Sequence, residues 1–119
     1  MKADNIILSK SKAFAVRIVR LYQYLCNDKK EFVLSKQLLR SGTSIGANAK
    51  EAVRGQSKPD FISKMSIALK EAAETEYWLE LLHETDFLDE TQFQSIYTDN
   101  QELLKILTNI VKSSKERRT

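Results

Sequence analysis

Apolar residues recur every three or four positions through most of this chain, the spacing that places side chains on one face of an α-helix. Four segments carry the pattern, and short polar stretches separate them. We expect four helices, at about residues 9–27, 34–54, 58–85 and 89–115. Because the connections are short, the predicted fold is all-α, an antiparallel up-down-up-down four-helix bundle that forms a single domain over residues 1–119.

Two of the helix starts have capping signals. Ser57 and Asp60 are spaced as a capping pair, with Pro59 in the first turn of the third helix. Asp89 and Gln92 resemble another such pair at the start of the fourth helix. These pairs predict where the third and fourth helices begin.

The second helix is rich in small residues. Gly42 and Gly46 lie in its interior, where each glycine costs roughly 1 kcal/mol relative to alanine. Packing of other helices must compensate, and the small side chains would allow those helices to approach closely. Ser41 and Asn48 lie on the polar edge of the same inward face.

The core stripe of the third helix contains a carboxylate. Glu76 falls among its apolar residues, where an unpaired charge would be costly. We expect Glu76 and Asn48 to be buried polar residues of the core. Asn48, Ser41 and Arg17 are the candidate partners of the carboxylate. The apolar members of the predicted stripe are Phe61, Met65, Ala68, Leu69, Ala72 and Leu79.

A second apolar face of the third helix lies well round from this stripe, so a monomer could not easily bury both. It consists of Ile67, Trp78, Leu81 and Leu82. A tryptophan on such a face is more often part of a protein contact than of a ligand site. We therefore expect an oligomer interface that includes Ile67, Trp78 and Leu81.

Charge is divided unevenly along the chain, although the net charge is only +3. Residues 1–57 contain eleven Lys or Arg and four Asp or Glu, whereas residues 58–119 contain eight and twelve. Such a basic half can bind a polyanion, yet charge blocks are more often solvated or paired within a protein or oligomer, and both interpretations stay open. The candidate cations form a row on the second helix and a pair on the first: Lys36, Arg40, Lys50, Arg54, Arg17 and Arg20.

Residue chemistry does not indicate an enzyme. The chain has no Gly-rich phosphate loop, and its one histidine, His83, has no Cys, Asp or His at metal-ligand spacing on the same face. Cys26 is the one cysteine, which excludes an internal disulfide, and no base lies near it in sequence to activate it. We expect no catalytic residue, metal or cofactor. The residues after Met1 form no apolar run long enough for a signal peptide or a membrane span, which predicts a cytoplasmic protein without membrane contact.

Residues of the second and third helices combine polar core positions with fixed spacing. They are Arg40, Ser41, Ser44, Ile45, Asn48 and Glu51, followed by Asp60, Phe61, Ala68, Glu76, Tyr77, Trp78 and Leu79. In this pattern the chain resembles the four-helix-bundle proteins named after 23S ribosomal RNA intervening sequences. The resemblance covers nearly the whole chain, from Phe14 to the fourth helix.

This resemblance implies a small bacterial protein, commonly a ring-shaped homopentamer, with no established enzymatic activity. Related accessory variability determinant proteins of diversity-generating retroelements are similar in fold and use a basic surface to associate with nucleic acid and a reverse transcriptase. The leading hypothesis is therefore an oligomer that binds RNA, single-stranded DNA or a ribonucleoprotein partner. The alternative is a purely structural or protein-binding oligomer whose basic half serves assembly.

Overall fold

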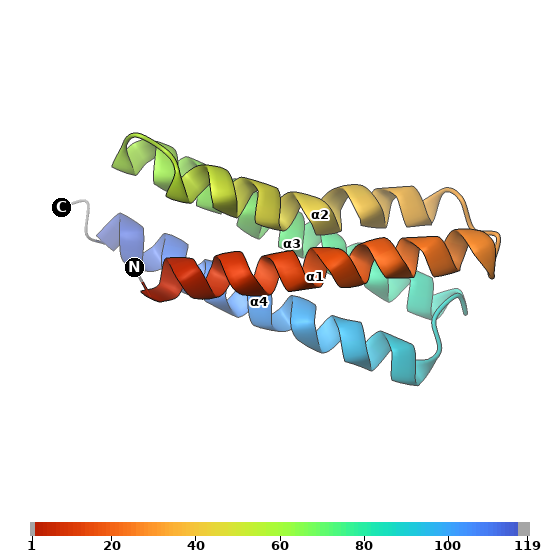
Figure 1. Cartoon of the computed structure of the whole chain (residues 1–119). Coiled ribbons are helices and arrows are strands. Elements are labelled where there is room, and N and C mark those ends of the chain that lie inside the picture. Colours follow the sequence, from red (N-terminus) through yellow and green to blue (C-terminus); the bar gives the residue numbers. More distant parts are fainter. Residues whose placement is uncertain (1, 117–119) are drawn as a thin grey trace.

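The four helices predicted from apolar spacing are all present in a computed structural model of the chain, which describes residues 2–116, with side chains from residue 5 onward (Figure 1). As predicted, consecutive helices run antiparallel in an up-down-up-down bundle. The bundle measures 49 × 21 × 20 Å. The described residues contain no strand. The helices are α1 (Lys2–Asn27), α2 (Leu34–Val53), α3 (Lys58–Glu84) and α4 (Glu90–Glu116).

Helix α1 begins at Lys2, so the start predicted near residue 9 is wrong. Ile7 is fully buried and extends the stripe of Phe14, Ile18 and Leu25 by two further turns toward the N-terminus. The apolar residues before Ser9 are therefore part of the helix, and Ile7 belongs to its core. The other seven helix ends lie within one residue of their predicted positions.

Capping side chains fix the starts of α2, α3 and α4. The Ser57 hydroxyl accepts the Asp60 N–H at 3.2 Å, and Asp89 and Gln92 each accept the other's backbone N–H, at 2.8 and 3.0 Å, as the capping patterns predicted. The start of α2 depends on Glu31, which no capping pattern in the sequence indicated. Its buried carboxylate accepts the backbone N–H groups of residues 33, 34 and 35, at 3.2, 3.0 and 2.7 Å. Burial alone would raise the pKa of Glu31, but these three donors outweigh it and hold the pKa below its usual range.

Glycines allow α1 and α2 to approach closely, as predicted. A Cβ atom on Gly42 would lie 2.8 Å from Cγ1 of Ile18, closer than real Cβ contacts permit. At Gly46 the nearest atom would be the hydroxyl oxygen of Ser11, at 3.1 Å. The small residues of α2 therefore determine how near α1 can pack.

The inward face of α3 shares its central residues with the predicted stripe but is rotated by a fraction of one residue step, so that the edges of the two differ. Thr75, not Glu76, is the buried polar residue, and its hydroxyl donates to Oγ of Ser41 at 2.9 Å. Leu82 is fully buried and does not belong to the outer apolar face. The buried residues of α3 are Ile62, Met65, Ala68, Ala72, Thr75, Leu79 and Leu82.

The predicted burial of Glu76 and Asn48 is therefore wrong. Both side chains are partly exposed. Glu76 Oε2 accepts a hydrogen bond of 3.4 Å from the Tyr97 hydroxyl, and Asn48 Nδ2 donates at 2.8 Å to the backbone oxygen of Ser44 in its own helix. The Thr75 hydroxyl needs only one neighbouring oxygen as a hydrogen-bond acceptor, so the residue can be buried at little cost. A carboxylate at the same position would lose its hydration without a compensating partner. In α4 the buried polar residue is Asn100, whose Nδ2 donates to the Ala72 carbonyl at 3.2 Å.

Candidate functional site

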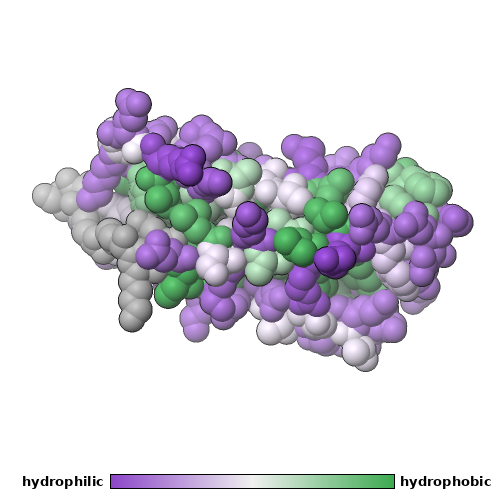
Figure 2. Space-filling model, in the orientation of Figure 1, coloured by the Kyte–Doolittle hydropathy of each residue, from purple (hydrophilic) through white to green (hydrophobic). Residues whose placement is uncertain are grey.

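A groove of about 800 Å³ runs between α1 and α2. Its apolar floor includes three valines that remain exposed, Val16 at 47%, Val19 at 38% and Val53 at 38%. Figure 2 shows hydrophobic side chains along the middle of this face, between hydrophilic margins. We call this the α1–α2 groove. Its floor is formed by Ala15, Val16, Val19, Gly46, Ala47 and Val53.

Four cations border the α1–α2 groove, two from each helix: Lys12, Arg20, Lys50 and Arg54. All four are exposed, and no ion pair involves them among the side chains that the structure describes. None of the described residues lining the groove is acidic. The nearby carboxylate of Glu51 is directed to α3, where it pairs with Lys64 at 3.5 Å. The rim is therefore a concentration of positive charge over an apolar floor.

The structure brings only some of the predicted basic residues together. Arg20, Lys50 and Arg54 meet at the groove, whereas Lys36 and Arg40 continue the row along the exposed side of α2. Lys12 was missed from the sequence, although it precedes Arg20 by eight residues, about two helical turns, and so shares its face. We call Lys36, Arg40, Lys50 and Arg54 the α2 row.

Arg17 does not join this group. It lies on the opposite flank of α1, where its guanidinium donates to Oδ2 of Asp99 at 2.6 Å and to both oxygens of Ser95, at 2.7 and 3.2 Å. Lys10 on the same flank pairs with Glu102 at 3.1 Å. The two cations that face α4, Lys10 and Arg17, are thus neutralised by carboxylates of the same chain.

The outward side of α3 carries the predicted interface residues. Ile67 is 38% exposed and Tyr77 57% exposed, and the Tyr77 ring meets the Trp78 ring edge-on, with centroids 5.1 Å apart. The Trp78 indole donates to Oε1 of Glu74 at 3.3 Å, and the same oxygen lies 3.8 Å from the guanidinium of Arg40. Leu81 is partly buried. We call Ile67, Glu74, Tyr77, Trp78 and Leu81 the α3 outer face.

A comparison with known protein families identifies the family of this four-helix bundle. Residues 3–109 match the family described as 23S rRNA-intervening sequence protein. The chain belongs to this family. The resemblance noted from its polar core positions is therefore confirmed.

A crystal structure from Bacteroides thetaiotaomicron VPI-5482, described as a protein with unknown function from the S23 ribosomal protein family, is similar to this chain. The two are 58% identical, and the match covers 92% of this chain and 98% of the other, with a TM-score of 0.91. No curated protein matches. The family is not a known enzyme family, and its described function is unknown. The comparisons therefore identify the fold and the family but no activity. A function has to be inferred from the exposed surfaces of the chain.

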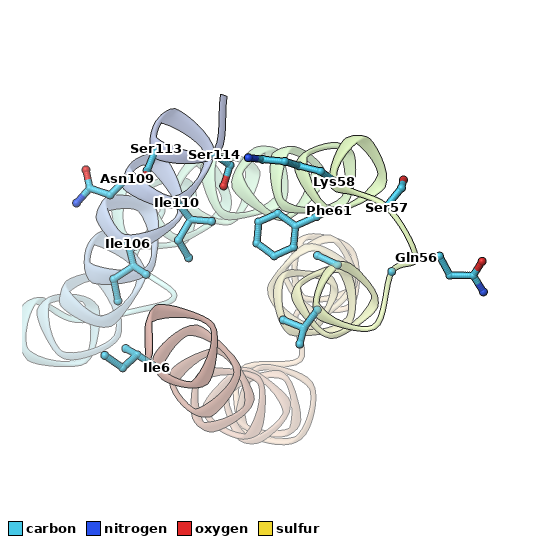
Figure 3. Close-up of a pocket in the computed structure, with 13 residues that line it drawn as sticks. Ile6, Gln56, Ser57, Lys58, Phe61, Ile106, Asn109, Ile110, Ser113 and Ser114 are labelled. Carbon is cyan, nitrogen blue, oxygen red and sulfur yellow. The ribbon is translucent and has the colours of Figure 1, made fainter. Parts of the chain in front are cut away.

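A second hollow of this family member lies at the end of the bundle where α2 ends and α3 begins (Figure 3). It measures about 730 Å³, and Phe61 and Ile110 point into the space between the helix ends. The described residues that line it include no Asp, Glu, His or Cys. Lys58 is their one titratable side chain, so these residues offer no acid–base pair.

The side chains with catalytic potential lie apart and have structural contacts. His83 stacks on Phe93 with centroids 4.1 Å apart, and its Nε2 lies 3.2 Å from Oε1 of Glu90. The Cys26 sulfur lies 3.7 Å from the hydroxyl of Ser35. Among the described residues no three His, Cys, Asp or Glu side chains gather as metal ligands would, and no helix is both long and apolar enough to cross a membrane.

Proposed function

We propose that this protein is a non-enzymatic homo-oligomer, a ring of five by family resemblance, that binds RNA or single-stranded DNA through the α2 row. The observation that carries the proposal is the contrast in pairing. Lys36, Lys50 and Arg54 are exposed and have no ion pair with another described side chain, and Arg40 is 67% exposed with only a 3.8 Å contact to Glu74. Arg17 is left out, because Asp99 already neutralises it.

The α2 row suits a polyanion that is recognised by charge. The row runs from Lys36 in the first turn of α2 to Arg54 at its C-cap, 18 residue steps or about 27 Å at 1.5 Å per residue. Each phosphate that a cation neutralises releases condensed counterions, which favours binding at low salt and makes it independent of base sequence. Repetition of the row in each subunit would raise the affinity by avidity, even where one subunit binds weakly.

The test is the binding of a labelled single-stranded RNA at low salt, followed by fluorescence anisotropy. A combined Lys36→Glu and Lys50→Glu variant should remain folded and oligomeric but lose most of the affinity. For the wild type, log K should fall with log salt by about 0.7 for each phosphate neutralised, and the variant should lose about 1.4 from that slope.

A matched control separates the row from net charge. Lys105 and Lys112 are exposed on α4, so Lys105→Glu with Lys112→Glu makes the same change of charge on another surface. This control should keep most of the binding. An equal loss in both variants, or no binding by the wild type at low salt, would contradict the proposal.

A structural oligomer that binds no nucleic acid is the second candidate. The exposed valines of the α1–α2 groove favour it, because phosphates gain nothing from an apolar floor whereas a protein surface does. In the RNA experiment this candidate predicts no binding by the wild type or by either variant.

A further inference from the structure

We propose that the hollow at the end of the bundle binds a free fatty acid, with the alkyl chain between the helix ends and the carboxylate at Lys58 (Figure 3). We call this space the end hollow. No residue of the α2 row lines it, so the site goes beyond the proposed function and stands whether or not the protein binds nucleic acid.

The end hollow follows from a small residue near the end of α2. Both Gly42 and Ala52 are buried on the inward face of this helix. At Gly42 no space is left, because Ile18 of α1 packs against it. At Ala52 the space between the helices stays open and measures about 730 Å³. Small-molecule sites in proteins measure about 300 to 1,000 Å³, so the end hollow has room for a small ligand.

The inside of the end hollow is apolar, and all four helices contribute to it. Phe61 of α3 and Ile110 of α4 point into the space between the helix ends (Figure 3). Ile6 of α1 and Val53 of α2 also line it, and they remain 39% and 38% exposed. An alkyl chain in this space would remove these side chains from water, which is favourable.

One side of the opening carries a positive charge. The exposed side chain of Lys58 extends along the rim toward Ser114 of α4 (Figure 3). Lys58 forms no ion pair with a side chain that the structure describes, and none of the described lining residues is acidic. An ammonium group at the edge of an apolar space is the complement of a carboxylate at the end of an alkyl chain.

The polar groups around the end hollow favour a fatty acid over other small ligands. A sugar or a nucleobase needs several polar groups that converge on it inside the site. Here the amides of Gln56 and Asn109 point away from the space (Figure 3). The acyl chain of a phospholipid has the same tail chemistry as a fatty acid, and the experiment therefore separates these two sources.

The experiment is isothermal titration calorimetry of the full chain with octanoate and decanoate, both below the concentration at which they form micelles. Decanoate should bind at one molecule per chain. It should bind about fifteenfold more tightly than octanoate, because each buried methylene group strengthens binding by about fourfold. A wild-type protein that binds neither fatty acid would overturn the proposal.

Lys58→Gln tests the position of the carboxylate. The substitution should weaken decanoate binding by about threefold to fivefold, as expected for an exposed ion pair, and should leave the binding of decanol unchanged. Lys105→Gln is the control and should bind decanoate as the wild type does, because Lys105 is exposed on α4 and does not line the end hollow. An equal loss for decanol, or no loss for decanoate, would overturn the assignment of the carboxylate to Lys58.

Ile6→Glu tests the position of the alkyl chain. A carboxylate in the apolar space should weaken the binding of decanoate and of decanol by at least about tenfold, since the ligand would bury it. Ile6 is exposed, so the variant should keep its helical circular dichroism. Gln101→Glu adds the same charge at an exposed position of α4 and should bind both ligands as the wild type does.

Two results would contradict the fatty acid as the ligand. One is unchanged decanoate binding in Ile6→Glu, which would mean that the alkyl chain lies elsewhere. The other is a wild-type protein that binds phosphatidylglycerol vesicles but not free decanoate, which would mean that a phospholipid supplies the tail.

Discussion

The two flanks of α1 each carry two cations, which form ion pairs on the flank toward α4 and none with a described side chain on the flank toward α2. Toward α4, Arg17 and Lys10 are held by Asp99 and Glu102 at 2.6 and 3.1 Å. Toward α2, Lys12 and Arg20 face a groove whose described lining contains cations and small apolar residues but no carboxylate. A basic residue therefore indicates a binding surface only where the neighbouring helix supplies no acid, and on α1 that distinction separates the two flanks of one helix.

The largest expected effect comes from forcing α1 and α2 apart. Gly42→Val adds branched atoms where even a Cβ would lie 2.8 Å from Ile18, so we expect a loss of about 3 kcal/mol in the free energy of unfolding. Urea denaturation followed by circular dichroism measures this loss. Ala73→Val, at an exposed position of α3, should change the stability by no more than about 0.5 kcal/mol. Equal midpoints for the two variants would show that the close approach is not needed.

A smaller loss is expected where α2 begins. Glu31→Gln keeps the shape of the side chain but removes the charge that accepts three backbone N–H groups, and should cost about 1 to 2 kcal/mol near pH 7. Because the pKa of Glu31 is lower in the folded chain than in the unfolded chain, its contribution is present above the unfolded pKa of about 4.3 and is lost as the pH falls through the folded pKa.

Denaturation at a series of pH values checks this dependence. The stability difference between wild type and Glu31→Gln should be greatest near neutral pH and should shrink in acid. A difference that stays constant down to pH 3 would mean that the cap does not depend on ionisation.

The smallest effects compare the two flanks directly. Arg17→Ala should lower the stability by less than about 1 kcal/mol, since its ion pair is partly exposed, and should leave RNA affinity unchanged. Arg20→Ala should leave the stability of the single chain within about 0.5 kcal/mol. Instead, it should weaken RNA binding, measured by fluorescence anisotropy, because Arg20 borders the same groove as Lys50 and Arg54. The reverse pattern would refute the distinction between the flanks.

Much of the fold could be predicted because its signals are local. Apolar spacing marked the four helices, and capping pairs such as Ser57 with Asp60 fixed two of the starts. The start of α1 was missed because the residues before Ser9 look like a short isolated apolar run. Only their burial against the other helices shows Ile7 to be part of the core.

The candidate site was predicted less well, since its residues come from two helices. Periodicity found Lys50 and Arg54 on α2 and Arg20 on α1, but it could not show that they border one groove with Lys12. It also grouped Arg17 with them, because the sequence gives no sign that Asp99, 82 residues away, is its neighbour.

The sequence by itself determined the helices, their order, the family and the uneven distribution of charge, because each of these depends on residues close together in the chain. Tertiary structure decided how far each helix is rotated about its axis and which charges meet a partner. The choice of Thr75 over Glu76 as the buried residue is an example, since the two positions lie at opposite edges of the same apolar stripe and periodicity does not decide between them. That rotation depends on packing against two neighbouring helices at once, at Ser41 on one side and Tyr97 on the other.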